Sequence, residues 1–149
     1  MAIARGAGTE IIRSASFESV DDAVQILIMG VQHHIYTVLS LTAQCITLSG
    51  SEKAYLILHG YDSMEGTTNQ DHYICDCVVS TVRETFVWND KFSFNGFEPT
   101  DFSGPLSTAA MQDAIADQGS GVAQYLKINT DSASTSYDVT ITFIDQNNA

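Results

Sequence analysis

The residues best suited to chemistry lie in one stretch, DHYICDC at residues 71–77, which brings two thiols, an imidazole and two carboxylates together in sequence. Thiolates, imidazoles and carboxylates are the groups that bind zinc. On a β-strand, successive side chains point to opposite faces, so His72 and Asp76 point away from the two cysteines. Tyr73 and Val79 share the cysteines' face. The set does not converge locally, and we expect Cys75 and Cys77 to pack as small apolar core residues.

Two further groups of side chains invite a functional interpretation. His33 and His34 are adjacent, so they diverge on a strand, and zinc would need ligands from elsewhere. We interpret them as ordinary polar or subunit-boundary residues. Five aromatic residues could form a stacking platform for sugars or single-stranded nucleic acid, but their spacing on strands fits a sandwich interior better. They are Phe86, Trp88, Phe92, Phe94 and Phe97.

No catalytic signature stands out in the chain. Acid/base catalysis needs two carboxylates facing one cleft, and no local spacing here enforces that arrangement. The sequence also lacks a GxSxG nucleophile motif and a Walker phosphate loop. We therefore expect a protein that is not an enzyme and that uses no cofactor and no metal.

The charge balance indicates which partners to expect. Six basic residues against 18 acidic ones give a net charge of −12 and a pI near 4.3. Binding to nucleic acid needs clustered Lys and Arg, so this charge argues against it, and it would also repel anionic membranes. The longest apolar run, near Ile26–Val31, is far short of the roughly 20 residues of a membrane span. A protein partner with a basic surface is the better expectation.

Hydrophobic periodicity predicts an all-β fold. From Tyr137 to Asp145, apolar and polar residues alternate with the two-residue period of a half-buried strand. Similar segments, rich in β-branched and aromatic residues, bring the expected number of strands to about eight. These segments are Val24–Met29, Ile35–Leu48, Tyr55–His59, His72–Val79, Glu84–Trp88, Lys91–Phe94 and Ala123–Ile128.

One helix is predicted at Thr108–Gln118, with Ser107 as its N-cap and Gly119 just past its end. One short helix among about eight strands, with no alternation of strands and helices, favours an antiparallel β-sandwich of jelly-roll or Greek-key type. A closed barrel is the alternative. We expect a single sandwich domain over residues 17–149.

Residues 1–16 are predicted to form an extended N-terminal arm, because Gly6 and Gly8 weaken a core strand there. A loosely ordered terminus is the alternative interpretation. In the arm hypothesis, a neighbouring subunit orders the segment, and its partner-binding residues are the two arginines and two isoleucines that it contains. These are Arg5, Ile11, Ile12 and Arg13.

Four segments resemble, in overall character, small proteins of marine tailed bacteriophages that are encoded near capsid genes. They are EIIRSASFESV (10–20), GVQHHIYTVLSL (30–41), ETFVWNDKFSFNGFEPTDFSGPL (84–106) and FIDQNNA (143–149). The resemblance implies a virion structural protein, most plausibly a capsid decoration or cement protein. Such proteins often have β-sandwich or barrel folds and frequently form trimers over capsid junctions.

The resemblance also implies partners and a location. We expect the chain to bind the major capsid protein and copies of itself, as a trimer, on the capsid surface. The start MAIARGAG lacks a secretory signal, so we expect synthesis in the host cytoplasm. Two other hypotheses stay open: a phage tail or host-recognition module that binds glycans near Trp88 and Phe97, and an intracellular metal-binding or redox protein that uses Cys75 and Cys77.

Overall fold

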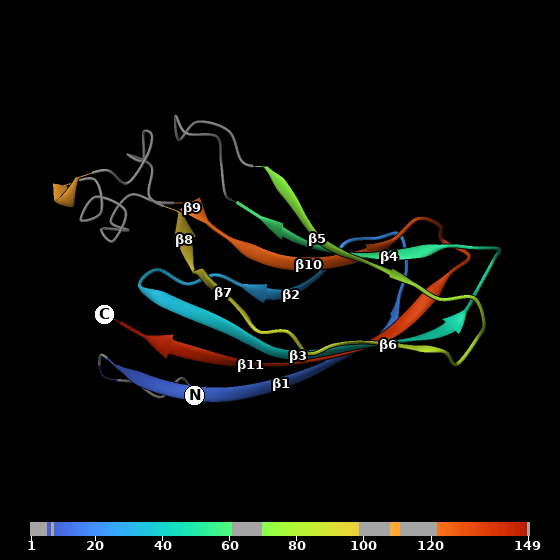
Figure 1. Cartoon of the computed structure of the whole chain (residues 1–149), viewed down its shortest axis with the longest axis horizontal. Helices are drawn as coiled ribbons and strands as arrows, with labels where there is room; N and C mark the ends of the chain where they lie inside the picture. The colour runs from blue at the N-terminus through green and yellow to red at the C-terminus, as the bar shows by residue number, and fades with distance from the viewer. Residues whose placement is uncertain (1–5, 7, 61–69, 99–107, 111–121, 149) are drawn as a thin grey trace.

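The computed structural model describes residues 6, 8–60, 70–98, 108–110 and 122–148 (Figure 1). Within these residues the fold consists of β-strands joined by turns, apart from Ala109 and Ala110, which are helical. The strands are β1 (Thr9–Val20), β2 (Gln25–Met29), β3 (His34–Thr47), β4 (Lys53–His59), β5 (Asp71–Val78), β6 (Thr85–Trp88), β7 (Phe92–Asn95), β8 (Phe97–Glu98), β9 (Val122–Ala123), β10 (Tyr125–Thr130) and β11 (Ser136–Asn147). No helix among the described residues is long and apolar enough to span a membrane.

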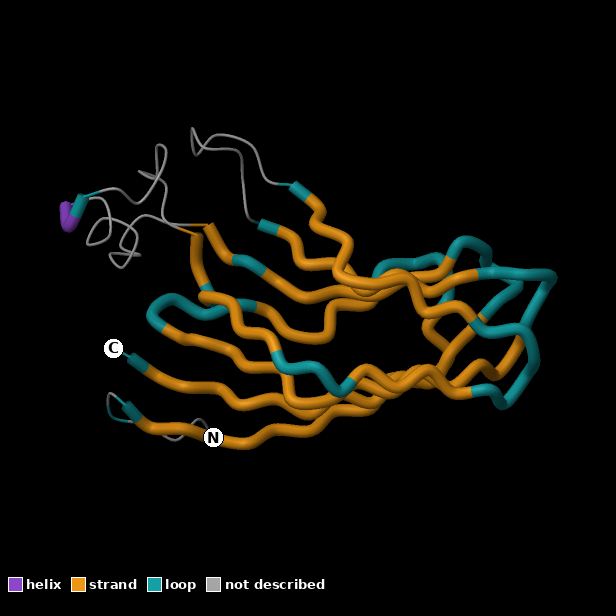
Figure 2. Tube along the Cα trace, in the orientation of Figure 1, coloured by secondary structure: helices purple, strands orange, loops and turns teal. Residues whose placement is uncertain are grey.

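The strands form two main sheets. Sheet A has the order β1-β11-β3-β6, with β7 also pairing β3, and sheet B has the order β2-β10-β4-β5. All of these pairings are antiparallel. The sheets lie one over the other, and most connecting turns lie at the two ends of the strands (Figure 2). The antiparallel β-sandwich expected from the periodicity is confirmed.

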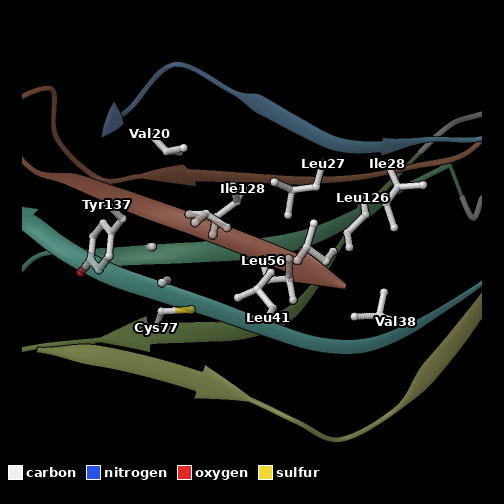
Figure 3. Close-up of a cluster of buried hydrophobic side chains, with 14 of the residues drawn as sticks. Val20, Leu27, Ile28, Val38, Leu41, Leu56, Cys77, Leu126, Ile128 and Tyr137 are labelled. Carbon is white, nitrogen blue, oxygen red and sulfur yellow. The ribbon is translucent and has the colours of Figure 1, made fainter. Parts of the chain in front are cut away.

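The core fills the space between the sheets because one face of each strand is apolar. On β11, Val139 and Ile141 are fully buried. Leu56 on β4 and Leu126 on β10 are also fully buried (Figure 3). Burying side chains of this size stabilises a fold by about 1.5–3 kcal/mol each. Four of the five residues of the aromatic block also pack here, as predicted. Phe94 is buried, while Phe86, Trp88 and Phe92 pack against the core from partly buried positions.

The N-terminal segment differs from the expected arm. β1 pairs with β11 from Thr9↔Asn147 to Phe17↔Val139, so the boundary expected after residue 16 falls inside a strand of sheet A. The physical reason is that successive side chains of a strand point to opposite faces of the sheet. Ala15 and Phe17 turn inward and pack against the core, while the glycines that suggested a weak strand lie before it. Residues 1–5 and 7 lie outside the described part of the chain.

Two other expectations need comment. The helix expected at Thr108–Gln118 falls almost entirely outside the described residues. The pairing of β4 with β5 contains a β-bulge. Leu56 pairs with Cys75, whereas the next residue, Ile57, pairs with Tyr73, so β5 has one extra residue here. The extra residue turns Tyr73 outward, where it is 62% exposed. Tyr73 therefore does not share the face of the cysteines, contrary to the strand pattern.

One junction ties the two sheets together at an end of the sandwich. The Gly30 N–H donates to the Gln124 carbonyl (2.8 Å), the Gln124 N–H to the Gly96 carbonyl (2.9 Å), and the Gly96 N–H to the His34 carbonyl (2.7 Å). A Cβ on Gly30 would lie 2.0 Å from the Gly96 oxygen, so only glycine allows this approach. The junction links the end of β2 in sheet B to the end of β7 in sheet A.

Candidate functional site

The four predicted partner-binding residues do not form one site. Arg5 lies outside the described residues. Ile12 is 69% exposed on the outer face of sheet A, whereas Ile11 is half-buried. Arg13 turns to the other side of β1, where its Nε donates to Asp145 Oδ2 at 3.2 Å. β1 therefore presents Ile12 to one surface and Arg13 to another.

Arg13 and Asp145 lie in a groove between the sheets. Its volume is about 240 Å³, and its walls are largely apolar. The Asp145 side chain is only 7% exposed and also binds His34 Nδ1 at 2.6 Å. Because both carboxylate oxygens are engaged by cationic or hydrogen-bonding groups, Asp145 is held in place rather than presented to a substrate. The groove is lined by Arg13, Leu27, Ile28, Met29, Val31, Tyr36, Phe143 and Asp145.

Among the described residues, the lining of this groove offers no serine, threonine, cysteine or lysine as a nucleophile. Its one carboxylate is already paired. Acyl or phosphoryl transfer needs an activated nucleophile beside a general base. What the groove provides is an apolar slot with an ion pair at its base. Sequence reasoning missed it, because Arg13 and Asp145 are 132 positions apart.

The outer face of sheet A is a surface of hydroxyl and aliphatic groups, here called the hydroxyl face. Cross-strand registers place its residues in rows across β1, β11, β3 and the β6/β7 edge. Some hydroxyls bond to one another, as in Ser14 with Thr142 (2.9 Å) and Ser16 with Thr140 (3.0 Å). The face comprises Ile12, Ser14, Ser16, Thr37, Ser40, Thr42, Val87, Ser93, Thr140, Thr142 and Ile144.

The hydroxyl face contains no charged residue, although the chain has a net charge of −12. Charges begin only at its margins, with Glu10 at one end of β1 and Asp138 on β11. Uncharged surface costs less to desolvate than charged surface, which is why interface cores are depleted of charged residues. The strand pattern alone could have indicated this face, because the outward positions of β1 and β11 read Ser-x-Ser and Thr-x-Thr.

The outer face of sheet B has a different character. His59 Nδ1 lies 2.6 Å from Asp71 Oδ1, and Lys127 Nζ donates to the same carboxylate at 2.9–3.0 Å. The His59 ring stacks on Tyr125 with ring centres 4.6 Å apart. A second aromatic pair, Tyr55 with Tyr73, meets edge to face at 5.5 Å. These groups offer aromatic surface beside a paired carboxylate.

Cys75 and Cys77 pack in or against the core, as the sequence predicted, and Cys45 does so as well. Cys45 and Cys77 are buried, Cys75 is half-buried, and all three are free thiols. A hydrogen bond to the Cys75 sulfur and burial together raise the pKa of the Cys77 thiol far above its usual range. Burial likewise raises the pKa of Cys45. Among the described residues, no group of three His, Cys, Asp or Glu side chains could hold a metal ion.

Comparison with known proteins adds little. No protein-family model matches the chain. No curated protein matches it either. Among solved structures, four chains match. One comes from work entitled "Bacillus endospore appendages form a novel family of disulfide-linked pili"; it has 12% identity and a TM-score of 0.43, with 100% of this chain and 97% of that chain covered. A likeness of this size says nothing about what this chain does.

Proposed function

We propose that this chain is a non-enzymatic virion structural protein, a decoration protein that binds the shell of the major capsid protein of a tailed bacteriophage. The observation that carries the proposal is the hydroxyl face. A decoration protein needs a broad, flat surface that can lose its water at low cost, and an uncharged sheet face meets that need. The proposal gives this face to the capsid shell.

The strand order supports a jelly roll as the finer fold. Sheet A has five strands, β1-β11-β3 with β6 and β7 both pairing along the outer edge of β3, and sheet B has four, β2-β10-β4-β5. Because β6 and β7 share one position in sheet A, each sheet has four strand positions. Each sheet thus interleaves strands from the two halves of the chain, which is what two Greek keys wrapped together produce. Jelly rolls recur in viral capsid proteins and in lectins, so the fold agrees with the proposal without selecting it.

Partners and location follow from the proposal. The chain would be made in the host cytoplasm and would assemble onto the outer surface of the capsid as a homo-oligomer, with a trimer as the expected form. The acidic charges that surround the hydroxyl face would meet basic groups of the shell. Many weak copies then act together, since multivalent contacts add up without any single strong one.

Co-sedimentation with purified capsid shells of a marine tailed phage tests the proposal. Thr140→Glu places a charge on the hydroxyl face, where Thr140 is exposed, and is expected to weaken binding at least about tenfold. Ser134→Glu adds the same charge in an exposed turn and is expected to bind like the wild type. Equal binding by both variants would remove the hydroxyl face from the proposal. A wild-type protein that ignores the shells would overturn the function itself.

A second candidate function is a host-recognition module that binds glycans. Trp88 and Phe97, the aromatics that suggested it, are both half-buried, and Trp88 packs against the core. The observation that favours it is the outer face of sheet B. There Tyr73 is 62% exposed, on the same strand as Asp71, which pairs with His59 and Lys127; these three residues are called the Asp71 cluster. Sugar C–H faces pack on aromatic rings, and a carboxylate accepts from sugar hydroxyls.

Titration with methyl hexopyranosides, followed by amide chemical shifts in NMR, tests this second candidate. Binding should shift the amides of β4, β5 and β10. Tyr73→Ala should abolish the shifts, whereas Tyr73→Phe keeps the ring and should retain them. If no glycoside shifts these amides at millimolar concentration, glycan binding at this face is excluded.

A further inference from the structure

The groove at Arg13 has an apolar floor. The pairing of β2 with β10 contains a β-bulge in which Leu27 is the extra residue. The bulge turns both Leu27 and the next residue, Ile28, toward the core, where both are buried (Figure 3). The buried rings of Tyr36 and Phe143 complete the floor from sheet A. A floor of this kind favours a ligand with an apolar body.

The rim of the groove carries one charge. Met29 and Val31 are half-exposed apolar residues of the rim, and the Arg13 side chain is also half exposed. Among the described residues that line the groove, Arg13 is the one cation. Binding sites for small molecules are commonly apolar with a few well-placed polar groups that fix the orientation of the ligand. Arg13 is such a group here.

The Arg13 guanidinium has donors to spare. A guanidinium carries five N–H groups in a planar fork. Within the described part of the chain, the Arg13 side chain makes one hydrogen bond, from Nε to Asp145 Oδ2 at 3.2 Å. The N–H groups on its two Nη atoms are therefore available to a ligand. A pair of guanidinium N–H groups matches the two oxygens of a carboxylate.

Asp145 does not cancel the charge of Arg13 completely. Its other oxygen, Oδ1, lies 2.6 Å from His34 Nδ1, which must donate because a carboxylate only accepts. The negative charge of Asp145 is thus shared between two donors. The net charge of −12 opposes an anion at long range, but at about 0.15 M salt the Debye length is about 8 Å. The groups beside the ligand then decide its binding.

We propose that this groove binds a small monocarboxylate with an apolar body of about six to eight carbons. The carboxylate pairs with the Nη groups of Arg13, and the apolar body lies on the floor. The groove has a volume of about 240 Å³. Since an apolar cavity of about 150 Å³ already holds benzene, a body of this size fits. The groove is too small for the row of alternate side chains that a peptide strand paired along β1 would present.

This site goes beyond the proposed function, because it does not use the hydroxyl face. Arg13 turns to the inner side of β1, whereas Ile12 lies on the hydroxyl face. Binding of a carboxylate in the groove therefore leaves the hydroxyl face uncovered. Its test uses this chain alone, without capsid shells, so the two proposals can fail separately.

Titration with octanoate at neutral pH and about 0.15 M salt, followed by amide chemical shifts in NMR, tests the inference. Shifts should map to β2, to Val31 and to β1 around Arg13, with a Kd at or below about 1 mM for a ligand of about ten non-hydrogen atoms. Octanamide has the same chain without the charge. It should bind at least about tenfold more weakly, because it lacks the charge-assisted hydrogen bonds.

Two variants of the groove separate charge from apolar contact. Arg13→Gln should remove the preference for octanoate over octanamide. Met29→Glu places a second carboxylate on the rim and should weaken octanoate binding at least about fivefold. Val24→Glu is the matched control, because Val24 is similarly exposed and lies just before β2 but does not line the groove. It should bind octanoate like the wild type.

The amide spectrum of each variant also shows whether it is folded. If Arg13→Gln does not fold, the comparison of Met29→Glu with Val24→Glu decides the test. An octanoate titration without shifts in the groove up to about 10 mM would overturn the inference. So would equal binding of octanoate and octanamide by the wild type, or equal binding of octanoate by Met29→Glu and Val24→Glu.

Discussion

At the scale of single residues, two buried tyrosines differ in what their hydroxyl groups do. The Tyr36 hydroxyl accepts a hydrogen bond from the Val31 N–H at 3.1 Å. The Tyr137 hydroxyl is buried without a hydrogen-bond partner among the described residues, and this burial raises its pKa to about 12. A buried hydroxyl without a partner lowers the stability of the fold. Removing a hydroxyl that accepts a hydrogen bond leaves its donor without a partner, which also lowers stability.

Phenylalanine substitutions separate these effects. Tyr137→Phe should leave the free energy of unfolding unchanged or raise it by up to about 1 kcal/mol, and Tyr36→Phe should lower it by about 1 kcal/mol. Urea unfolding at neutral pH measures both, and each variant is the control for the other because both lose one hydroxyl from sheet A. A clear loss of stability in Tyr137→Phe would mean that its hydroxyl has a partner.

The pKa shift of Asp71 makes the stability of the fold depend on pH, and its direction determines whether stability rises or falls with pH. Its partial burial raises its pKa, but hydrogen bonds from His59 and Lys127 outweigh this and hold the pKa below the usual 3.8. A carboxyl with a lowered folded-state pKa stabilises the fold above the unfolded value, and that contribution disappears as the pH falls through the folded value. The side chain is 38% exposed, so solvent screens the effect.

We therefore expect the stability of Asp71→Asn to fall less than that of the wild type as the pH becomes acidic. From pH 5 downward, the urea midpoint of the wild type should fall more steeply than that of the variant. Asp76→Asn is the matched control, because Asp76 lies on the same strand and also pairs with a lysine, Lys53, at 3.2 Å. If both variants follow the wild type, the Asp71 cluster contributes nothing to folding.

At the scale of elements, most strands could be predicted but not the role of β1. The strands at Ile35–Leu48 and Tyr137–Asp145 are present within a few residues, because their alternation is local. β1 was predicted as an arm because Gly6 and Gly8 weaken a core strand, but both precede Thr9, where pairing with β11 begins. Arg13, on the inward side of β1, needs an acceptor there. Its acceptor, Asp145, is supplied by the far end of the chain. The bulge that turns Tyr73 outward depends on pairing with β4 and leaves no local signal.

Two truncations test whether β1 belongs to the sandwich. Deleting residues 1–8 stops before the first paired residue, Thr9, and should change the free energy of unfolding by less than about 0.5 kcal/mol. Deleting residues 1–14 removes pairs with β11 and the Arg13–Asp145 bond, and should cost about 3 kcal/mol or more. Urea unfolding distinguishes these outcomes. If the two truncated proteins were equally stable, the arm hypothesis would be correct, and the pairing of β1 with β11 would not contribute to the stability of the sandwich.

At the scale of the whole molecule, composition indicated an acidic protein that meets other proteins, but it could not say where. The uncharged hydroxyl face becomes visible only when strands distant in sequence are placed side by side. Ile12 and Thr140, for instance, belong to one face because β1 pairs with β11, the last strand of the chain. Contact with the shell and self-association therefore both depend on surfaces that only the assembled sheets form.

These two contacts should respond to salt in opposite ways. Two copies carrying −12 each repel one another, so screening should strengthen apolar association between them. An acidic protein on a basic shell is attracted by charge, so screening should weaken that contact. Raising the ionic strength from about 0.1 M to about 1 M shortens the Debye length from about 10 Å to about 3 Å, which covers the relevant range. Sedimentation of the protein alone and co-sedimentation with shells measure the two responses. Self-association that weakens with salt would mean that attraction between opposite charges, rather than apolar contact, holds the copies together.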